Sequence, residues 1–181
     1  QARADNPLHG PAFMGAMALA ARDGGAIGIR ANGPDDVRAV KAAGLPVIGI
    51  HKVFSEQYPV YITPDFEAAA AVVAAGADVV ALDCTQRPRN GEHPKALVRR
   101  IREELGAEVF ADISTLDEGL AAADWGATYV ATTLSGYTEC TEPRPEHPDL
   151  RLVELLARRL DSPVIAEGRY NSPDWVRRGF E

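Results

Sequence analysis

Short apolar runs alternate along this chain with longer stretches that have helical spacing. Six such runs occur, at residues 26–29, 46–50, 79–82, 109–111, 129–131 and 163–166. Near-continuous apolar runs separated by amphipathic helices are typical of parallel strands that are buried on both faces. The pattern therefore predicts a succession of βα units and an α/β fold class.

Seven helices are predicted around these runs from their start and stop signals. Proline opens several of them, as at Pro34 and Pro94, and glycine follows several, as at Gly44 and Gly106. Proline suits the first turn of a helix, and glycine suits the residue after its end. The predicted ranges are 11–22, 34–43, 63–75, 94–105, 114–126, 150–160 and 172–181.

Polar residues follow each apolar run directly or after one residue. The strands lead in turn into Arg30, Lys52, Asp83, Asp112, Thr132 and Glu167. In a (β/α)8 barrel the carboxyl ends of all strands meet at one mouth, whereas an open doubly wound sheet usually binds its ligand at a single switch point. Polar chemistry at every strand end therefore favours the barrel, although the open sheet remains an alternative.

The chain is shorter than a complete barrel of this type. A (β/α)8 barrel has eight strands and typically ~250 residues, whereas this chain has 181 residues. We therefore expect one domain, residues 1–181, that is incomplete at both ends. Gln1 would be the tail of the first strand, strands two to seven would be intact, and strand eight would be missing.

Composition excludes several classes of partner. The net charge of −7 argues against nucleic acid, which requires a basic face. No apolar run approaches the ~18 residues of a membrane span, and no secretory leader is recognisable at the start. The two cysteines, Cys84 and Cys140, form neither a disulfide framework nor a zinc motif. These features predict a cytoplasmic protein.

Five short motifs occur together in one order and cover nearly the whole chain. They are PLHGP at 7–11, GIRANG at 28–33, ADIST at 111–115, TTLSGYT at 132–138 and AEGR at 166–169. In this combination the chain resembles the N-acetylmannosamine-6-phosphate 2-epimerases of bacterial sialic acid catabolism. The resemblance implies a barrel enzyme that interconverts N-acetylmannosamine 6-phosphate and N-acetylglucosamine 6-phosphate without a cofactor. It leaves the oligomeric state open, with a homodimer among the options.

The resemblance also assigns roles to individual residues. It implies that Lys52 is the base at C2 of the sugar and that Glu167 completes the acid/base set. The substrate-binding residues that it implies are Gln1, Arg30, Asp112, Gly168 and Arg169, with Gln1 and Arg30 at the sugar phosphate, Asp112 orienting the substrate and Arg169 as a phosphate contact. Two features depart from the family pattern: His51 and Val53 flank the lysine, and the glycine-rich segment of strand eight is absent.

Strand order supports the same chemistry independently of the resemblance. If Lys52 ends strand three and Glu167 ends strand seven, the two residues are four strands apart and face each other across an eight-stranded mouth. Inversion of a carbon by proton removal and return needs groups on both of its faces. The lysine must be neutral to act as a base, so burial or a cation such as Arg30 must lower its pKa. Glu167 must be protonated to act as the donor.

Several alternatives stay open at this point. Asp83 could bind substrate or cap the following helix, and His51 alternates with Lys52 and could point into the layer between barrel and helices. A Schiff-base aldolase that uses Lys52 as nucleophile and a non-catalytic sugar-phosphate-binding domain are rival functions. No paired His and carboxylate ligands suggest a metal-dependent pentose-phosphate epimerase, and no glycine fingerprint indicates a nicotinamide cofactor.

Overall fold

Six parallel strands form one sheet in which every strand lies beside the next one in the chain. The computed structural model describes residues 2, 5–141 and 146–181, so the predicted first-strand residue Gln1 lies outside the described residues. The strands are β1 (Ile29–Asn32), β2 (Val47–Ile50), β3 (Val79–Asp83), β4 (Glu108–Asp112), β5 (Tyr129–Ala131) and β6 (Val164–Ile165). The predicted α/β fold with parallel βα units is confirmed.

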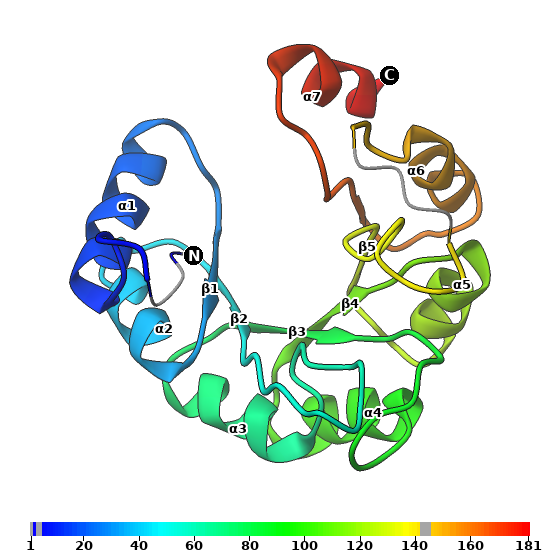
Figure 1. Ribbon diagram of the computed structural model, residues 1–181, viewed down its shortest axis with the longest axis horizontal. Coiled ribbons are helices and arrows are strands. Elements are labelled where there is room, and N and C mark those ends of the chain that lie inside the picture. Colours follow the sequence, from blue (N-terminus) through cyan, green and yellow to red (C-terminus); the bar gives the residue numbers. More distant parts are fainter. Residues whose placement is uncertain (1, 3–4, 142–145) are drawn as a thin grey trace.

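The sheet curls into an open ring with the helices on its outside (Figure 1). The helices are α1 (Pro11–Asp23), α2 (Pro34–Lys41), α3 (Phe66–Ala74), α4 (Pro94–Glu104), α5 (Leu116–Asp124), α6 (Leu150–Ala157) and α7 (Pro173–Phe180). A doubly wound sheet reverses its strand order and carries helices on both faces. Sequential order with helices on one face is instead that of a TIM-barrel-like fold.

Two elements start three residues later than the sequence predicts. The first strand begins at Ile29 rather than at residue 26, because Ile29 is opposite Val47 at the start of the pairing with β2, while Ile27 is 89% exposed. The third helix begins at Phe66 rather than at residue 63, because the side chain of Asp65 accepts a hydrogen bond from the Ala68 amide and caps the helix there.

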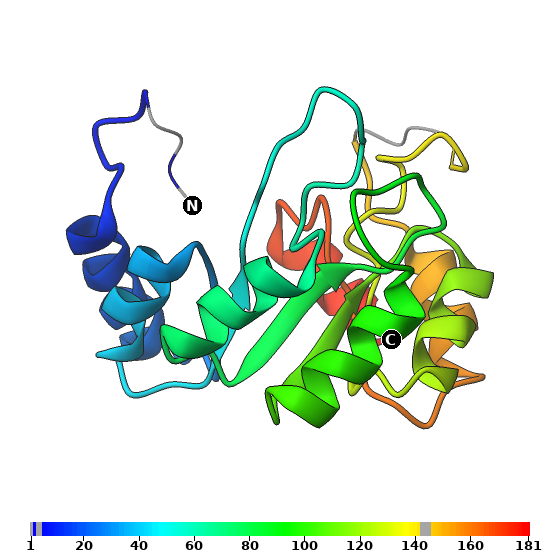
Figure 2. The same cartoon turned by 90° about the horizontal axis from the view of Figure 1, so that it is seen from below.

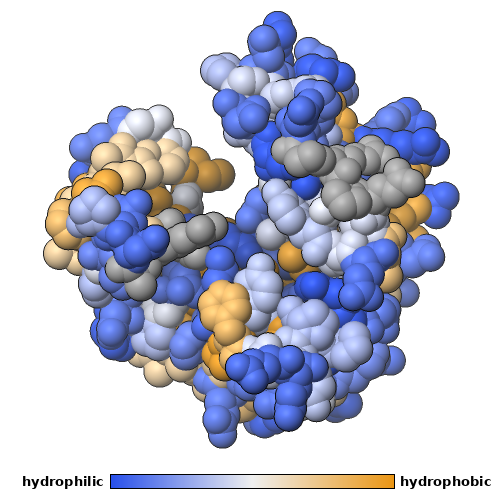
Figure 3. Space-filling view, in the orientation of Figure 1, coloured by the Kyte–Doolittle hydropathy of each residue, from blue (hydrophilic) through white to orange (hydrophobic). Residues whose placement is uncertain are grey.

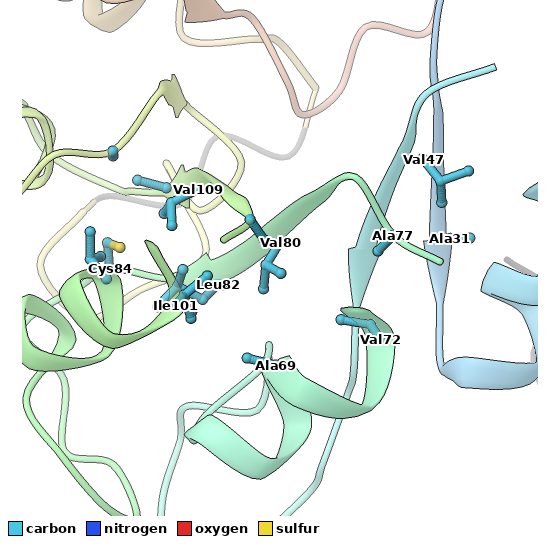
Figure 4. Packing of buried hydrophobic residues seen from close by; sticks show 14 of the residues in the cluster. Ala31, Val47, Ala69, Val72, Ala77, Val80, Leu82, Cys84, Ile101 and Val109 are labelled. Carbon is cyan, nitrogen blue, oxygen red and sulfur yellow. The ribbon is translucent and has the colours of Figure 1, made fainter. Parts of the chain in front are cut away.

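The two faces of the sheet contribute to two separate apolar clusters. On the outer face, Val80 and Leu82 of β3 belong to one cluster with Ala69 and Val72 of α3 and with Ile101 of α4 (Figure 4). On the inner face, a smaller cluster consists of Ile50, Ile62, Val79, Ala81, Phe110, Ala131 and Leu134. The inner cluster lies inside the curl, and Ile62 and Leu134 join it from the segments that follow β2 and β5.

Close packing between β2 and α3 depends on a glycine. A Cβ atom at Gly49 would lie 2.7 Å from Cβ of Ala77 and 3.0 Å from Cβ of Val72. Neither neighbour can rotate away, because both contacts are made by Cβ atoms. The missing side chain at Gly49 thus lets the helix layer approach the strand that leads to Lys52.

Loops at the carboxyl ends of the strands project from one side of the sheet (Figure 2). Glu118 ties two of them together, because it closes a capping box with Thr115 at the start of α5 and also accepts hydrogen bonds from the backbone amides of Gln86 and Ser114. This side chain fixes the loops after β3 and β4 around the mouth.

Candidate active site

The carboxyl ends of the strands surround a cavity of about 460 Å³. Figure 3 shows the molecule from this side, with a hollow at the centre of the curl. Three charged side chains from three different segments line the cavity: Arg30 of β1, Lys52 after β2 and Glu167 after β6. The sheet thus brings together residues that are separated by more than a hundred positions in the chain.

Arg30 connects the two sides of the curl. Its guanidinium donates two hydrogen bonds to the carboxylate of Asp112, at 3.0 Å to Oδ1 and 2.6 Å to Oδ2. It donates a third, at 3.2 Å, to Oε2 of Glu167. Asp112 is fully buried and also accepts a hydrogen bond from the hydroxyl of Thr133 at 2.7 Å. Because both carboxylate oxygens of Asp112 have hydrogen-bond partners, this buried side chain fixes the direction of the Arg30 guanidinium.

The environments of Lys52 and Glu167 favour the neutral form of each side chain. Burial lowers the pKa of the Lys52 ammonium, and the charge of Arg30 lowers it further, against the opposing effect of the carboxylates. Burial raises the pKa of the Glu167 carboxyl, with Arg30 opposing and Asp112 reinforcing the rise. A lysine pKa that is lowered and a carboxyl pKa that is raised both move toward the range that general acid–base catalysis uses. The cavity can therefore move a proton on and off a bound carbon acid.

The backbone of Lys52 is held in place on both sides. Its amide donates a hydrogen bond to the side chain of Asn32 at 2.9 Å, and it pairs with Ile62 in an isolated antiparallel bridge. His51 does not line the cavity, and its Nδ1 is buried without a hydrogen-bond partner among the described residues. The proposed orientation of His51 toward the helix layer stays a prediction.

The two predicted residues after Glu167 differ in their placement. Gly168 lines the cavity and has a φ of 104°, which favours glycine. Arg169 is not among the lining residues, and its guanidinium donates hydrogen bonds to the carbonyl oxygens of His147 at 2.7 Å and Ser135 at 2.8 Å. Arg169 thus joins the loop after β6 to the loop after β5.

The carboxylate of Asp83 is bound by side chains of the loop that follows β3. This buried carboxylate accepts hydrogen bonds from the hydroxyl of Thr85 at 2.6 Å and from Arg87 at 2.5 Å, and it forms an ion pair with Arg89 at 3.4 Å. It does not cap the next helix, whose N-cap is His93. Of the two alternatives, the helix cap is thus wrong, and the carboxylate anchors the loop over the mouth.

Sequence reasoning missed part of the cavity wall. Tyr61, Ile62 and Tyr137 line it, and Thr133 contacts Asp112 there. Tyr61 and Ile62 belong to a long excursion after β2 that returns to the sheet through the bridge with Lys52. No spacing rule reveals such a return, so only the TTLSGYT motif gave a signal for this wall, at Thr133 and Tyr137.

Other kinds of site were also sought. In the part of the chain that the structure describes, no three His, Cys, Asp or Glu side chains are grouped so that they could hold a metal ion. Among the described helices, none has both the length and the apolar character that a membrane crossing requires.

Comparisons with known proteins agree with this geometry. Residues 14–181 match the model of the NanE family, described as "Putative N-acetylmannosamine-6-phosphate epimerase". Proteins named "Putative N-acetylmannosamine-6-phosphate 2-epimerase" from Clostridioides difficile and Synechococcus elongatus are 46% and 47% identical to it. The alignments cover 100% of this chain and 81% and 79% of those proteins.

A solved structure of the N-acetylmannosamine-6-phosphate 2-epimerase from Clostridium perfringens is also similar. It superposes with a TM-score of 0.94 at 41% identity, over 99% of this chain and 79% of that one. Thiamine phosphate pyrophosphorylase from Pyrococcus furiosus, at 16% identity and a TM-score of 0.63, shares the fold alone. The chain belongs to the NanE family of N-acetylmannosamine-6-phosphate epimerases.

Proposed function

We propose that this chain interconverts N-acetylmannosamine 6-phosphate and N-acetylglucosamine 6-phosphate by proton transfer at C2, in the breakdown of sialic acid and other amino sugars. The family membership and the names of its relatives support the substrate. The observation that carries the mechanism is that Lys52 and Glu167 line one cavity, in environments that favour a neutral amine and a protonated carboxyl. No cofactor takes part in this proposal.

The proton transfer uses the two side chains in turn. In one direction, neutral Lys52 removes the C2 proton of the open-chain sugar and becomes an ammonium, while the electron pair of the C2–H bond passes toward the C1 carbonyl oxygen to give an enolate. Protonated Glu167 then delivers its proton to the opposite face of C2 and becomes a carboxylate. In the reverse direction the roles exchange, and proton exchange with water resets both groups. The cationic Arg30, fixed by Asp112, lies where it can stabilise the negative charge that develops on the substrate.

The phosphate end of the substrate needs a separate set of contacts. We assign it to the residues that the family resemblance implies, with Gly168 offering a backbone amide at the mouth. Arg169 would act there by holding the loops together, since its guanidinium is bound to two carbonyl oxygens. Gln1 completes the assignment at the phosphate, whereas Arg30, which the resemblance also places at the phosphate, lines the cavity with Lys52 and Glu167 and is assigned to the reacting end.

We extend the proposal to the architecture and the setting. Strands β1–β6 would be the second to seventh strands of a (β/α)8 barrel, and residues 1–181 one domain of it. The curl of the sheet in Figure 1 and the superposition on a longer epimerase support this. Both cysteines are free thiols, which suits a reducing compartment such as the cytoplasm.

Proton NMR in D2O tests the proposed function. Incubation with N-acetylmannosamine 6-phosphate should yield N-acetylglucosamine 6-phosphate with deuterium at C2. Product that keeps its C2 hydrogen would contradict the proton-transfer mechanism, and no product at all would favour a binding domain. Borohydride in the presence of substrate should leave the protein unmodified, whereas a Schiff-base aldolase would be trapped as a covalent adduct at Lys52.

A further inference from the structure

One wall of the cavity is apolar, and the lysine lies against it. Ile50 and Ile62 are 2% and 4% exposed and line the cavity together with Tyr61. Lys52 is the second residue after β2 and pairs with Ile62 across the isolated bridge. Its Nζ lies 5.9 Å from the centre of the Tyr61 ring. The proposed base is thus placed beside a hydrophobic surface as well as near the charged groups.

The ring of Tyr61 is held in a defined orientation. Phe54 stacks on it, with ring centroids 4.9 Å apart and an interplanar angle of 21°. Phe54 itself is 76% exposed, so the stacked pair reaches the protein surface while the Tyr61 ring also lines the cavity. A ring that is fixed in this way presents a rigid wall rather than an adaptable one.

The proposed substrate has one apolar group, the methyl of its N-acyl chain. The nitrogen that carries the acyl group is attached to C2, the reacting carbon. Across a trans amide the methyl carbon lies about 3.8 Å from C2, as two Cα atoms do across a peptide bond. Reacting atoms approach to about 3–3.5 Å, so the methyl lies within roughly 7 Å of Nζ of Lys52. The Tyr61 ring lies within that distance.

We propose that Tyr61, with Ile50 and Ile62, forms the subsite for the N-acyl methyl group and that the Tyr61 ring limits the size of the acyl chain the protein accepts. This inference rests on the proposed function, because it takes C2 to react beside Lys52. It adds a specificity-determining residue that neither the motifs nor the acid/base pair identifies.

The subsite also explains why an apolar surface adjoins a catalytic amine. The acyl methyl covers the surface when substrate binds and excludes water from the space beside Lys52. An added or missing methylene in a hydrophobic pocket changes kcat/KM by roughly 10–200-fold. An N-propanoyl substrate should therefore react at least tenfold less efficiently than the N-acetyl substrate.

The test is a selectivity ratio measured on the full chain. We would determine kcat/KM for N-acetyl- and N-propanoylmannosamine 6-phosphate with the wild type, Tyr61→Ala and Tyr61→Trp. Removing the ring should raise the propanoyl-to-acetyl ratio at least tenfold, and the larger indole should lower it. Tyr58→Ala, in the same loop but outside the cavity wall, is the matched control and should keep the wild-type ratio.

The possible outcomes distinguish failure of the proposed subsite from failure of the proposed function. If the wild type reacts with neither sugar, the proposed function fails. If it reacts but does not discriminate between the two acyl groups, or if Tyr61→Ala slows both substrates equally, the subsite is refuted while the function stands. Circular dichroism checks the fold of each variant. If Tyr61→Ala does not fold, an unchanged ratio in Tyr61→Trp refutes the subsite.

Discussion

Replacing Arg30 by glutamine should destabilise the protein and move its pH profile in a defined direction. The change removes two hydrogen bonds to Asp112, at 2.6 and 3.0 Å, and leaves that fully buried carboxylate without its cation. A hydrogen bond to a charged group contributes about 1.5–3 kcal/mol, so the two sum to about 3–6 kcal/mol. Breaking a buried ion pair by removing one partner costs about 3–5 kcal/mol of stability, which agrees with the sum for the two hydrogen bonds.

That loss is large enough to measure by thermal unfolding. One kcal/mol shifts the Tm of a domain of this size by about 2–4 °C, so Arg30→Gln should lower the Tm by about 6–20 °C. If the Tm falls by less than about 3 °C, the Arg30–Asp112 pair is not the buried link that we describe.

The same variant tests the electrostatics of the acid/base pair. Arg30 lowers the pKa of both Lys52 and Glu167, so its removal should raise both pKa values. With N-acetylmannosamine 6-phosphate as substrate, Lys52 must be neutral and Glu167 protonated, so the acid limb of kcat/KM reports Lys52 and the alkaline limb reports Glu167. Because both pKa values rise, the whole bell-shaped profile should move to higher pH. Arg30→Gln should also lower kcat by the 10²–10³-fold that is typical of losing a positioned group that stabilises developing negative charge.

Asp112→Asn is the matched comparison for the pH profile. Asp112 raises the pKa of both Lys52 and Glu167, the opposite of what Arg30 does. Its neutralisation should therefore move the profile to lower pH, although it breaks the same ion pair. Shifts of both variants in the same direction would refute the electrostatic reasoning, because general damage to the site would then explain them.

Three further predictions concern packing, thiol chemistry and substrate. Gly49→Ala should lower the free energy of unfolding by about 1–3 kcal/mol through overpacking. Gly28→Ala is the control and should leave it unchanged, because its Cβ would meet only a carbonyl oxygen at 3.5 Å. Equal stability of the two variants in urea would contradict this prediction. Cys140 is exposed, and burial raises the pKa of the Cys84 thiol, so a disulfide reagent should titrate one thiol in the native protein and two in denaturant. The unphosphorylated sugar should react far more slowly than its 6-phosphate, since remote binding energy orients the reacting carbon; comparable kcat/KM values would show otherwise.

Much of the fold could be predicted because its signals are local. Proline and glycine mark several helix ends in the sequence, and in the structure the capping box at Thr115 fixes the start of α5 close to its predicted position. The first strand was placed too early because residues 26–28 are as apolar as a strand. Only the pairing of Ile29 with Val47 sets the register, and with it the inward direction of Arg30.

The candidate site could be predicted only where its residues end strands. Lys52, Asp112 and Glu167 follow apolar runs, so their meeting at one mouth follows from parallel strand order. Tyr61 gave no such signal, because it reaches the cavity through a bridge between two non-adjacent segments. For Arg169 the sequence suggests an anion contact, which stays a prediction, whereas its hydrogen bonds to two carbonyl oxygens appear only in three dimensions.

The central claim is that Lys52 and Glu167 act on opposite faces of one carbon, and hydrogen exchange in single variants tests it most directly. Lys52→Met removes the base on one face, and Glu167→Gln removes the acid on the other. Each should lower epimerisation by at least the ~10²–10⁴-fold typical of a positioned acid or base.

The exchange pattern at C2 in D2O then identifies the faces. Each variant keeps one of the two groups, so each should still exchange the C2 hydrogen of one sugar, without converting it. The account predicts that Lys52→Met exchanges one epimer and Glu167→Gln the other, as followed by proton NMR of both 6-phosphates. Exchange of the same epimer by both variants, or epimerisation at near wild-type rate in either, would contradict it.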